Sequence, residues 1–174
     1  MKIQLWSCQY DPEPLGIGPI STLWAQEMKR LGHEIEVVAA HPHYPSPEWG
    51  SRLVPYREIR DGVPVTRLPL KVGRKTKRQR LIQELSYLAA LTVSSPFLGT
   101  PDALVAVSPS FPALLPAILD TRVRRIPWIL WLQDILPDGA ASTGYFEDED
   151  RTYRLSRRLE DKAYASAGKI VVLS

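Results

Sequence analysis

Apolar residues along the chain fall into two patterns: short continuous runs, and longer segments in which they recur every three or four residues. The short runs predict buried strands, and the recurring segments predict helices with one apolar face. Strands are expected at residues 2–9 and 34–40, with a helix between them that ends at Gly32. The residues expected on the buried face of that helix are Ile20, Leu23, Trp24, Met28 and Leu31. Strand, helix and strand within about forty residues predict a βαβ unit with a parallel sheet.

The alternation continues to the end of the chain. Residues 56–60 and 63–68 predict a hairpin around Asp61-Gly62, a dipeptide typical of tight turns. Further buried strands are expected at 102–107, 128–133 and 169–173, and further helices from residue 81 toward Pro96, over 112–122 and over 149–165. The expected inward residues are Leu81, Ile82, Leu85, Leu88 and Ala89 in the first of these helices and Tyr153, Leu155, Leu159 and Tyr164 in the last. The predicted fold class is α/β, a Rossmann-like parallel sheet flanked by helices.

The composition is that of an ordinary globular protein, with 44% apolar and 24% charged residues among 174. This length suits one domain with its own hydrophobic core. Cys8 is the only cysteine, so no disulfide can form within the chain, which fits a reducing cytoplasm. No signal peptide is visible, and no apolar run reaches the roughly 18 residues that a membrane-spanning helix needs.

Two glycines, Gly16 and Gly18, follow the first strand, and Pro19 stands at the start of the next helix. A helix N-terminus presents free backbone N–H groups, which suit an anion such as a phosphate. A dinucleotide fingerprint needs a third glycine where Ser21 stands and an acid after the second strand, so an NAD site is disfavoured. The P-loop motif is absent as well. The glycines therefore indicate a phosphate site or, as the alternative, only a tight turn.

The loop after the second strand leaves the same edge of the sheet and contains His41, His43 and Tyr44. No third ligand is evident nearby, so no metal site is expected. We interpret the loop as a pocket wall that contacts a sugar or an acceptor. A plain rigid loop is an equal alternative.

Two further polar segments end strands at that edge. Gln133 and Asp134 follow the strand that begins at residue 128, where a carboxylate can orient a hydroxyl group or act as a base. Capping of the next helix is the alternative for Asp134. For Ser108, which ends the strand from residue 102, helix capping is favoured over lining the cleft.

Residues 71–80 hold a cluster of cations without one acid, and an apolar segment follows over 85–99. The cations are Lys71, Arg74, Lys75, Lys77, Arg78 and Arg80. Nucleic-acid binding is not expected, because the cluster has neither aromatic stacking partners nor a recognisable motif. Contact with an anionic membrane surface is favoured, since the cations can meet lipid headgroups while apolar side chains enter the interface. The alternative is a solvated helix start.

Four segments follow one another along the chain: YDPEPLGIGPISTLWAQEMKRLGHEIEVVAAHPHYP, YREIRDGVPVTRLPL, DALVAVSPS and LWLQDILPDGA. In these segments and their order the chain resembles the N-terminal domain of family 4 retaining glycosyltransferases of the GT-B fold. The subgroup that it resembles most comprises bacterial surface-polysaccharide enzymes, including those of colanic acid biosynthesis. The resemblance spans essentially the whole chain.

The resemblance implies one half of a two-domain enzyme, with residues 1–174 as the acceptor-side domain and a donor-binding C-terminal domain beyond Ser174. Gly16 and Gly18 would approach the diphosphate of a nucleotide-sugar donor, and Asp134 is the candidate catalytic residue. The residues expected to line the acceptor pocket are His41, His43, Tyr44, Ser108 and Gln133. No cofactor or metal is expected besides the nucleotide-sugar co-substrate.

The expected function is the acceptor-binding half of a retaining, hexosyl-type glycosyltransferase of cell-surface polysaccharide biosynthesis. A polyprenyl-linked or saccharide acceptor is implied, at the inner face of the cell membrane, which agrees with the basic and apolar segment over 71–99. This domain alone is not expected to turn over. The alternative is a non-catalytic Rossmann-like binding or regulatory module.

Overall fold

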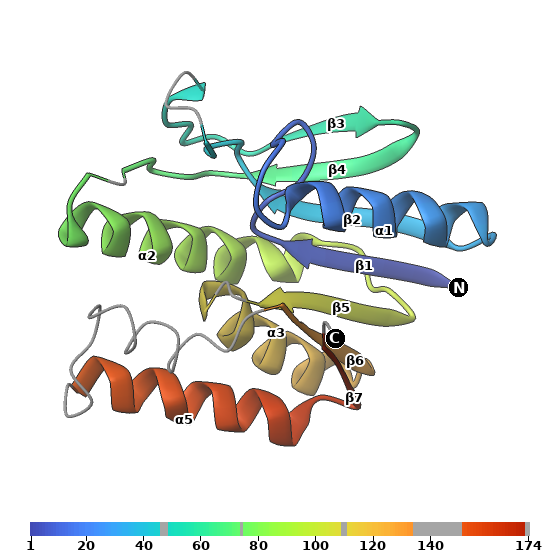
Figure 1. Ribbon diagram of the computed structural model, residues 1–174. Helices are drawn as coiled ribbons and strands as arrows, with labels where there is room; N and C mark the ends of the chain where they lie inside the picture. The colour runs from blue at the N-terminus through green and yellow to red at the C-terminus, as the bar shows by residue number, and fades with distance from the viewer. Residues whose placement is uncertain (46–48, 74, 109–110, 134–150, 173–174) are drawn as a thin grey trace.

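The computed structural model describes residues 1–45, 49–73, 75–108, 111–133 and 151–172. Within these ranges one seven-stranded sheet has the order β3-β4-β2-β1-β5-β6-β7 (Figure 1). The strands are β1 (Lys2–Ser7), β2 (Glu34–Ala40), β3 (Tyr56–Arg60), β4 (Val63–Leu68), β5 (Ala103–Ser108), β6 (Trp128–Leu132) and β7 (Lys169–Val172). Neighbouring strands are parallel except for β3 and β4, which form an antiparallel hairpin at one edge. The predicted α/β class with a mostly parallel sheet is confirmed.

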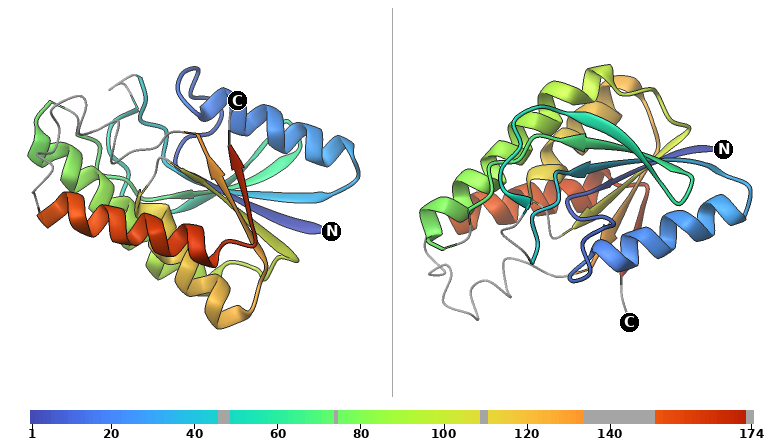
Figure 2. Two further views of the ribbon diagram at one scale, coloured as in Figure 1. Left: turned by 60° about the horizontal axis from the view of Figure 1, so that its bottom comes forward. Right: turned by 90° about the horizontal axis from the view of Figure 1, so that it is seen from above.

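Helices cover both faces of the sheet. α1 (Gly18–Arg30) lies on one face, whereas α2 (Lys77–Ser94), α3 (Phe111–Arg124) and α5 (Arg151–Ser166) lie on the other, as Figures 1 and 2 show. A short 3-10 turn, η2 (Ser95–Phe97), follows α2. Successive strand residues point to opposite faces, so each buried strand supplies two cores. Leu5 belongs to the core beneath α1, and Trp6 belongs to the core beneath the other helices.

The order of strands in the sheet indicates a ligand site at the carboxyl end of β1. β1 pairs with β2 on one side and with β5 on the other, both in parallel. The helices that follow β1 and β5 lie on opposite faces of the sheet, so the carboxyl ends of these two strands form a topological switch point, where open α/β sheets bind ligands. The loops after β1 and β2 both leave the sheet at this edge.

Most predicted boundaries are confirmed. β2 and the β3–β4 hairpin have the predicted bounds, and Asp61 and Gly62 both have positive φ values (48° and 73°), as the tight hairpin turn requires. α2 begins at Lys77, four residues before the expected start at residue 81. The cause is Thr76, whose hydroxyl accepts a hydrogen bond from the backbone N–H of Gln79 at 3.1 Å and so caps the helix.

The predicted buried face of α1 is only partly correct. Trp24 and Met28 pack against the core, but Ile20, Leu23 and Leu31 are exposed. The fully buried positions are the small residues Ser21 and Ala25, together with Gly18. Small side chains allow the helix backbone to lie close to the sheet, and this contact decides the buried face more strongly than hydrophobicity does.

The buried faces of α2 and α5 and the burial of β7 also differ from the prediction. In α2, Leu81, Leu85 and Ala89 are exposed, and Tyr87 and Leu91 are buried instead. In α5, Leu159 and Tyr164 pack against the core as predicted, but Leu155 is 69% exposed, and Ala163 is also buried. β7 is exposed along its length because it is the edge strand. The side chain of Tyr153 and the whole of Leu173 lie outside the described residues.

Candidate functional site

The glycine turn stands at the N-terminus of α1, at the carboxyl edge of the sheet. The N-cap residue of this helix is Ile17, which offers no side-chain hydrogen bond, and Pro19 occupies the first turn. The side chain of the cap residue therefore accepts no hydrogen bond from the first turn, and the helix end carries a partial positive charge. This arrangement suits an anionic group.

Both glycines of the turn are required by the surrounding structure. Gly16 has φ +68°, and a Cβ there would lie 2.5 Å from Oε1 of Gln9, which also accepts a hydrogen bond from the Ile17 N–H at 3.2 Å. Gly18 is buried, and a Cβ there would lie 2.6 Å from the carbonyl oxygen of Glu13. Gly16 is exposed and leaves its backbone open at the edge, whereas Gly18 is needed for packing within the loop.

Ser21 stands where a dinucleotide fingerprint has its third glycine. It is buried, and its Oγ lies 2.9 Å from Oγ of Ser7 in β1. This small side chain allows the close packing of helix on strand that the third glycine provides in that fingerprint. The feature that still disfavours an NAD site is the absence of an acid after β2, where the chain reads Ala40-His41.

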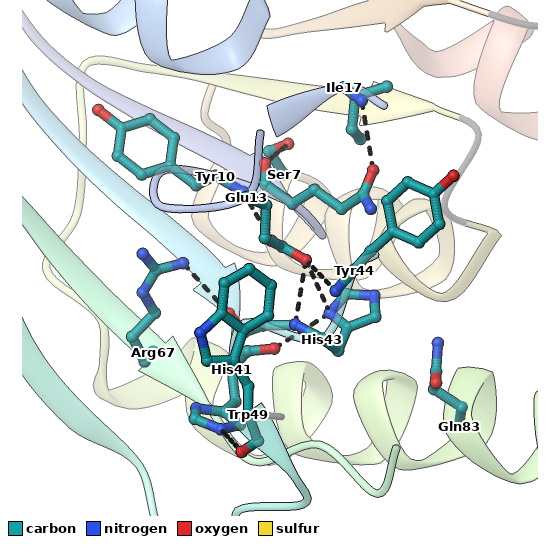
Figure 3. Close-up of polar contacts among 12 residues, drawn as sticks. Ser7, Tyr10, Glu13, Ile17, His41, His43, Tyr44, Trp49, Arg67 and Gln83 are labelled. Carbon is teal, nitrogen blue, oxygen red and sulfur yellow. Dashed lines mark hydrogen bonds and ion pairs between the residues drawn. The ribbon is translucent and has the colours of Figure 1, made fainter. Parts of the chain in front are cut away.

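Glu13 joins the loop after β1 to the loop after β2 (Figure 3). Its side chain has no exposed surface. Oε1 accepts hydrogen bonds from the backbone N–H groups of His43 at 3.1 Å and Tyr44 at 2.9 Å, and Oε2 accepts one from the N–H of Tyr10 at 3.2 Å. Nδ1 of His43 lies 3.3 Å from Oε1. One carboxyl group is therefore bonded to the backbone of both loops.

The environment of Glu13 also changes its acidity. Burial raises the pKa of Glu13 from 4.5 to about 7, against the lowering effect of the N–H groups of His43, Tyr10 and Tyr44. Oε1 accepts two backbone N–H groups and Oε2 accepts one, so a proton on this carboxyl group would be carried by Oε2. Loss of solvation favours the neutral acid of Glu13, whereas the hydrogen bonds favour its carboxylate.

Arg67 of β4 is a second buried charge next to these loops. Its side chain has no exposed surface, and Nε donates to Oε1 of Glu58 at 2.7 Å. Nη1 donates to the carbonyl oxygen of Ala40 at 3.3 Å, and Nη2 donates to that of Asp11. Arg67 therefore holds together β3, the end of β2 and the loop after β1, because each of these segments supplies one of its acceptors.

The ring of His41 is occupied by contacts within the domain. Nε2 lies 3.0 Å from the carbonyl oxygen of Trp49, so this nitrogen carries the proton and donates. Nδ1 then accepts from the hydroxyl group of Tyr56 at 3.4 Å. These contacts direct the ring toward the segment between β2 and β3, so His41 supports the loop that carries His43 and Tyr44.

The other predicted pocket residues fall into two groups at the edge of the sheet. His43 and Tyr44 lie against Glu13, and Nδ1 of His43 donates to the carbonyl oxygen of His41 at 3.1 Å. Ser108 ends β5 and Gln133 follows β6, and the backbone N–H of Gln133 donates to the carbonyl oxygen of Ser108 at 3.3 Å. The sheet thus brings Ser108 and Gln133 side by side on the β5–β6 side of β1.

Some predicted site residues are not covered by the structure. Asp134 and Arg74 lie outside the described residues, as does the side chain of Lys77. Lys75, Arg78 and Arg80 are exposed at the start of α2, as a surface-binding role requires. Among the described residues, no group of three or more His, Cys, Asp and Glu side chains is placed to hold a metal ion, and no helix is long and apolar enough to cross a membrane.

Glu13 and Arg67 are not predicted as site residues from the sequence. Charged residues in a loop and near a hairpin edge are expected to be exposed, and their partners lie far away in the sequence. The spacing between Glu13 and Tyr44 is 31 residues, and that between Arg67 and Asp11 is 56. The position of Glu13 between Pro12 and Pro14 is its only unusual sequence feature.

Comparison with known proteins identifies the family. The model of the glycosyl transferase 4-like domain matches residues 16–174, so the chain belongs to that family. The chain is also 28% identical over 152 residues to WcaI of Escherichia coli K12, whose name assigns it to colanic acid biosynthesis as a glycosyl transferase. That match covers 83% of this chain and 37% of WcaI, so the chain spans less than half the length of this relative.

Solved structures confirm the fold at low sequence identity. Sucrose-phosphate synthase from Thermosynechococcus elongatus aligns with a TM-score of 0.62 and 11% identity, over 99% of this chain and 42% of that one. UGT89C1 of Arabidopsis thaliana, solved with UDP, aligns with a TM-score of 0.59 and 12% identity, again over 99% and 42%. The architecture is that of the N-terminal domain of GT-B glycosyltransferases, as the sequence predicts.

Proposed function

We propose that this member of the glycosyl transferase 4-like family is the acceptor-side half of a retaining, hexosyl-type glycosyltransferase. The enzyme moves a sugar from a nucleotide-sugar to a lipid-linked or saccharide acceptor in cell-surface polysaccharide biosynthesis. The family match over residues 16–174 and the similarity to WcaI support the activity and the pathway. A second domain, which binds the nucleotide-sugar, completes the site.

The observation that carries this proposal is the N-terminus of α1 next to the exposed Gly16, at the switch point of the sheet. In the reaction, the bond between the anomeric carbon and the donor phosphate oxygen breaks, and a bond from that carbon to an acceptor oxygen forms. The nucleoside diphosphate leaves with additional negative charge. Backbone N–H groups and the positive end of α1 stabilise that charge without having to reorganise.

The acceptor binds on the side of the loop that contains His43 and Tyr44. In this proposal His43 and Tyr44 contact the acceptor, His41 supports them from behind, and Ser108 and Gln133 form the opposite wall. Asp134 orients the acceptor hydroxyl group or removes its proton. The protein needs no cofactor and no metal ion of its own in this scheme, since the helix terminus meets the diphosphate directly.

Exposed groups at the start of α2 support a position at the inner face of the cell membrane. Lys75, Arg78 and Arg80 are exposed, and Leu81 and Leu85 next to them are 54% and 51% exposed. Cations beside exposed apolar side chains match the requirements of an anionic lipid interface. A protein bound there meets a lipid-linked acceptor without crossing the membrane.

A donor screen with the full-length protein tests the proposed function. Hydrolysis of each nucleotide-sugar is measured first without acceptor, and transfer is then measured to a polyprenyl-pyrophosphate-linked sugar and to free saccharides. We expect one nucleotide-sugar to be consumed, with retention of the anomeric configuration in the product. If none is hydrolysed or transferred, the proposal fails and a non-catalytic binding module becomes the better account.

A further inference from the structure

Glu13 is the most deeply buried acid at the candidate site, and the proposed reaction gives it no part. Its side chain has no exposed surface, so it cannot touch a substrate. All the contacts described for its carboxyl group are with the protein itself, and three of them are with backbone N–H groups. Glu13 therefore acts on the reaction only through the residues that it contacts.

We propose that Glu13 is a positioning residue for the acceptor, because its carboxyl group sets the place of the His43-Tyr44 backbone beside the glycine turn. The proposal rests on the proposed function, since it assigns the acceptor to that loop. In Figure 3 the carboxyl group lies between the loop after β1 and the backbone of His43 and Tyr44. The N–H groups of the two residues point to the same oxygen, Oε1, at 3.1 and 2.9 Å.

The backbone of Glu13 is fixed independently of its side chain. Its carbonyl oxygen lies where a Cβ of Gly18 would come within 2.6 Å, so Glu13 packs directly on the start of α1. The N–H of the same residue donates to the Tyr10 carbonyl oxygen at 3.2 Å. Glu13 therefore has one end at the donor-side glycine turn and the other at the acceptor-side loop, and its length sets the distance between them.

Substitutions that change the Glu13 side chain and keep its backbone should therefore affect the acceptor-side loop and leave the glycine turn intact. Glu13→Gln keeps the size and the backbone contacts, but a Gln amide presents NH₂ on one side, which opposes a backbone N–H either at Tyr10 or at His43 and Tyr44. Glu13→Asp keeps the charge but is one methylene shorter, so its carboxyl group cannot reach both loops in the same way. In both variants Gly18 and the start of α1 keep their packing.

The test measures acceptor and donor kinetics separately in the full-length protein. For Glu13→Gln and Glu13→Asp we expect the acceptor KM to rise by about tenfold, as loss of one or two buried hydrogen bonds implies, with the donor KM and acceptor-free hydrolysis of the nucleotide-sugar within about twofold of wild type. Glu27→Gln is the matched control. It is the same Glu-to-Gln change at a side chain that is 46% exposed on α1. It is expected to leave all three quantities unchanged.

Amide hydrogen exchange provides a second readout that does not depend on turnover. We expect the His43 and Tyr44 amides to exchange faster in Glu13→Asp than in wild type, while amides in β1 and β2 keep their protection. Faster exchange throughout the domain would show a general loss of stability and would overturn the positioning role.

Two kinetic outcomes also overturn the inference. One is an unchanged acceptor KM in both variants, and the other is an equal loss of acceptor-free donor hydrolysis, which a merely structural role predicts. Failure of the proposed function is recognised differently: the wild-type protein itself then transfers no sugar from any donor, and the positioning role falls with it. A wild-type enzyme that transfers sugar, with variants that match it, rejects the role of Glu13 alone.

Discussion

The protein holds charged residues in two contrasting ways. At the carboxyl edge of the sheet, Glu13 and Arg67 have no exposed side-chain surface, and their partners come from separate segments of the chain. At the start of α2, Lys75, Arg78 and Arg80 are exposed to solvent. Glu13 and Arg67 are therefore held by partners inside the protein, whereas the three cations at the start of α2 lie at the surface.

The contrast follows from the cost of burying a charge. Each donor or acceptor of a buried ion needs a partner in the protein, because water does not reach it. Removal of one partner leaves the remaining polar groups buried without a hydrogen bond. An exposed ion keeps its water and contributes little to stability. Substitutions should therefore change the stability of the protein at the first region and its surface binding at the second.

Replacement of Arg67 should produce the largest effect. Arg67→Met removes the donors to Glu58 and to the carbonyl oxygens of Ala40 and Asp11, and we expect the free energy of unfolding to fall by about 4 kcal/mol in urea titrations. Arg60→Met is the matched control. Arg60 pairs with the same Glu58 but is 38% exposed, so its loss should cost less than about 1 kcal/mol. Equal losses in the two variants would contradict the distinction between buried and exposed charges.

Neutralisation of the exposed cations should affect binding to lipid. The triple variant Lys75→Gln, Arg78→Gln and Arg80→Gln should lose about 3 kcal/mol of binding free energy to phosphatidylglycerol vesicles, measured by sedimentation, because each cation near an anionic surface contributes about 1 kcal/mol. Its unfolding free energy should stay within about 0.5 kcal/mol of wild type.

A variant with the same change in net charge serves as the control for this experiment. Arg122→Gln, Arg158→Gln and Lys162→Gln replace exposed cations of α3 and α5, away from the start of α2. If this control loses as much vesicle binding as the first variant, net charge rather than the surface at α2 is responsible. Unchanged binding in the first variant would favour a solvated helix start.

Much of the fold could be predicted because it depends on local pattern. The bounds of β2 and of the β3–β4 hairpin follow from apolar runs and from Asp61-Gly62, whose backbone conformation is decided within a few residues. The buried faces of the helices were harder to predict. Apolar spacing placed Leu23 inward, whereas the approach of α1 to the sheet required the small side chains of Ser21 and Ala25.

The candidate site was predictable only in its location. The carboxyl edge, the glycine turn and the loop with His43 all follow from the order of strands and helices. The contacts that shape the site depend on backbone groups that come together only in the folded chain, such as the N–H of Tyr44 and the carboxyl group of Glu13. No local sequence pattern predicts that an acid in a loop will be buried.

A change at Gly18 tests how tightly that loop is packed. Gly18→Ala places a Cβ 2.6 Å from the carbonyl oxygen of Glu13, a backbone atom that cannot move freely, so we expect a loss of about 2 kcal/mol in unfolding free energy. Gly32→Ala is the comparison, since a Cβ there would have no atom within 4 Å apart from its own chain neighbours, and the cost comes from φ +87° alone, about 1 kcal/mol. A Gly18 variant as stable as wild type would show that the loop can shift.

The buried carboxyl group should also give the protein a pH dependence that the exposed charges do not. Burial raises the pKa of Glu13 from 4.5 to about 7, so between these values the folded state binds more protons than the unfolded state. The free energy of unfolding contributed by Glu13 is therefore full below about pH 4.5 and falls as the pH rises to about 7. Above that range the contribution is constant again, because the group is ionised in both states.

Comparison with Glu13→Gln isolates this contribution from all other titrating groups. Urea unfolding at several pH values should show wild type losing stability relative to Glu13→Gln between about pH 4.5 and about pH 7, and a constant difference above pH 7. A difference between wild type and Glu13→Gln that does not change with pH would mean that the N–H groups of His43, Tyr10 and Tyr44 fully offset the cost of burial. Glu13 would then join the two loops as a permanent carboxylate, and its charge, rather than its proton, would be what the acceptor-side loop depends on.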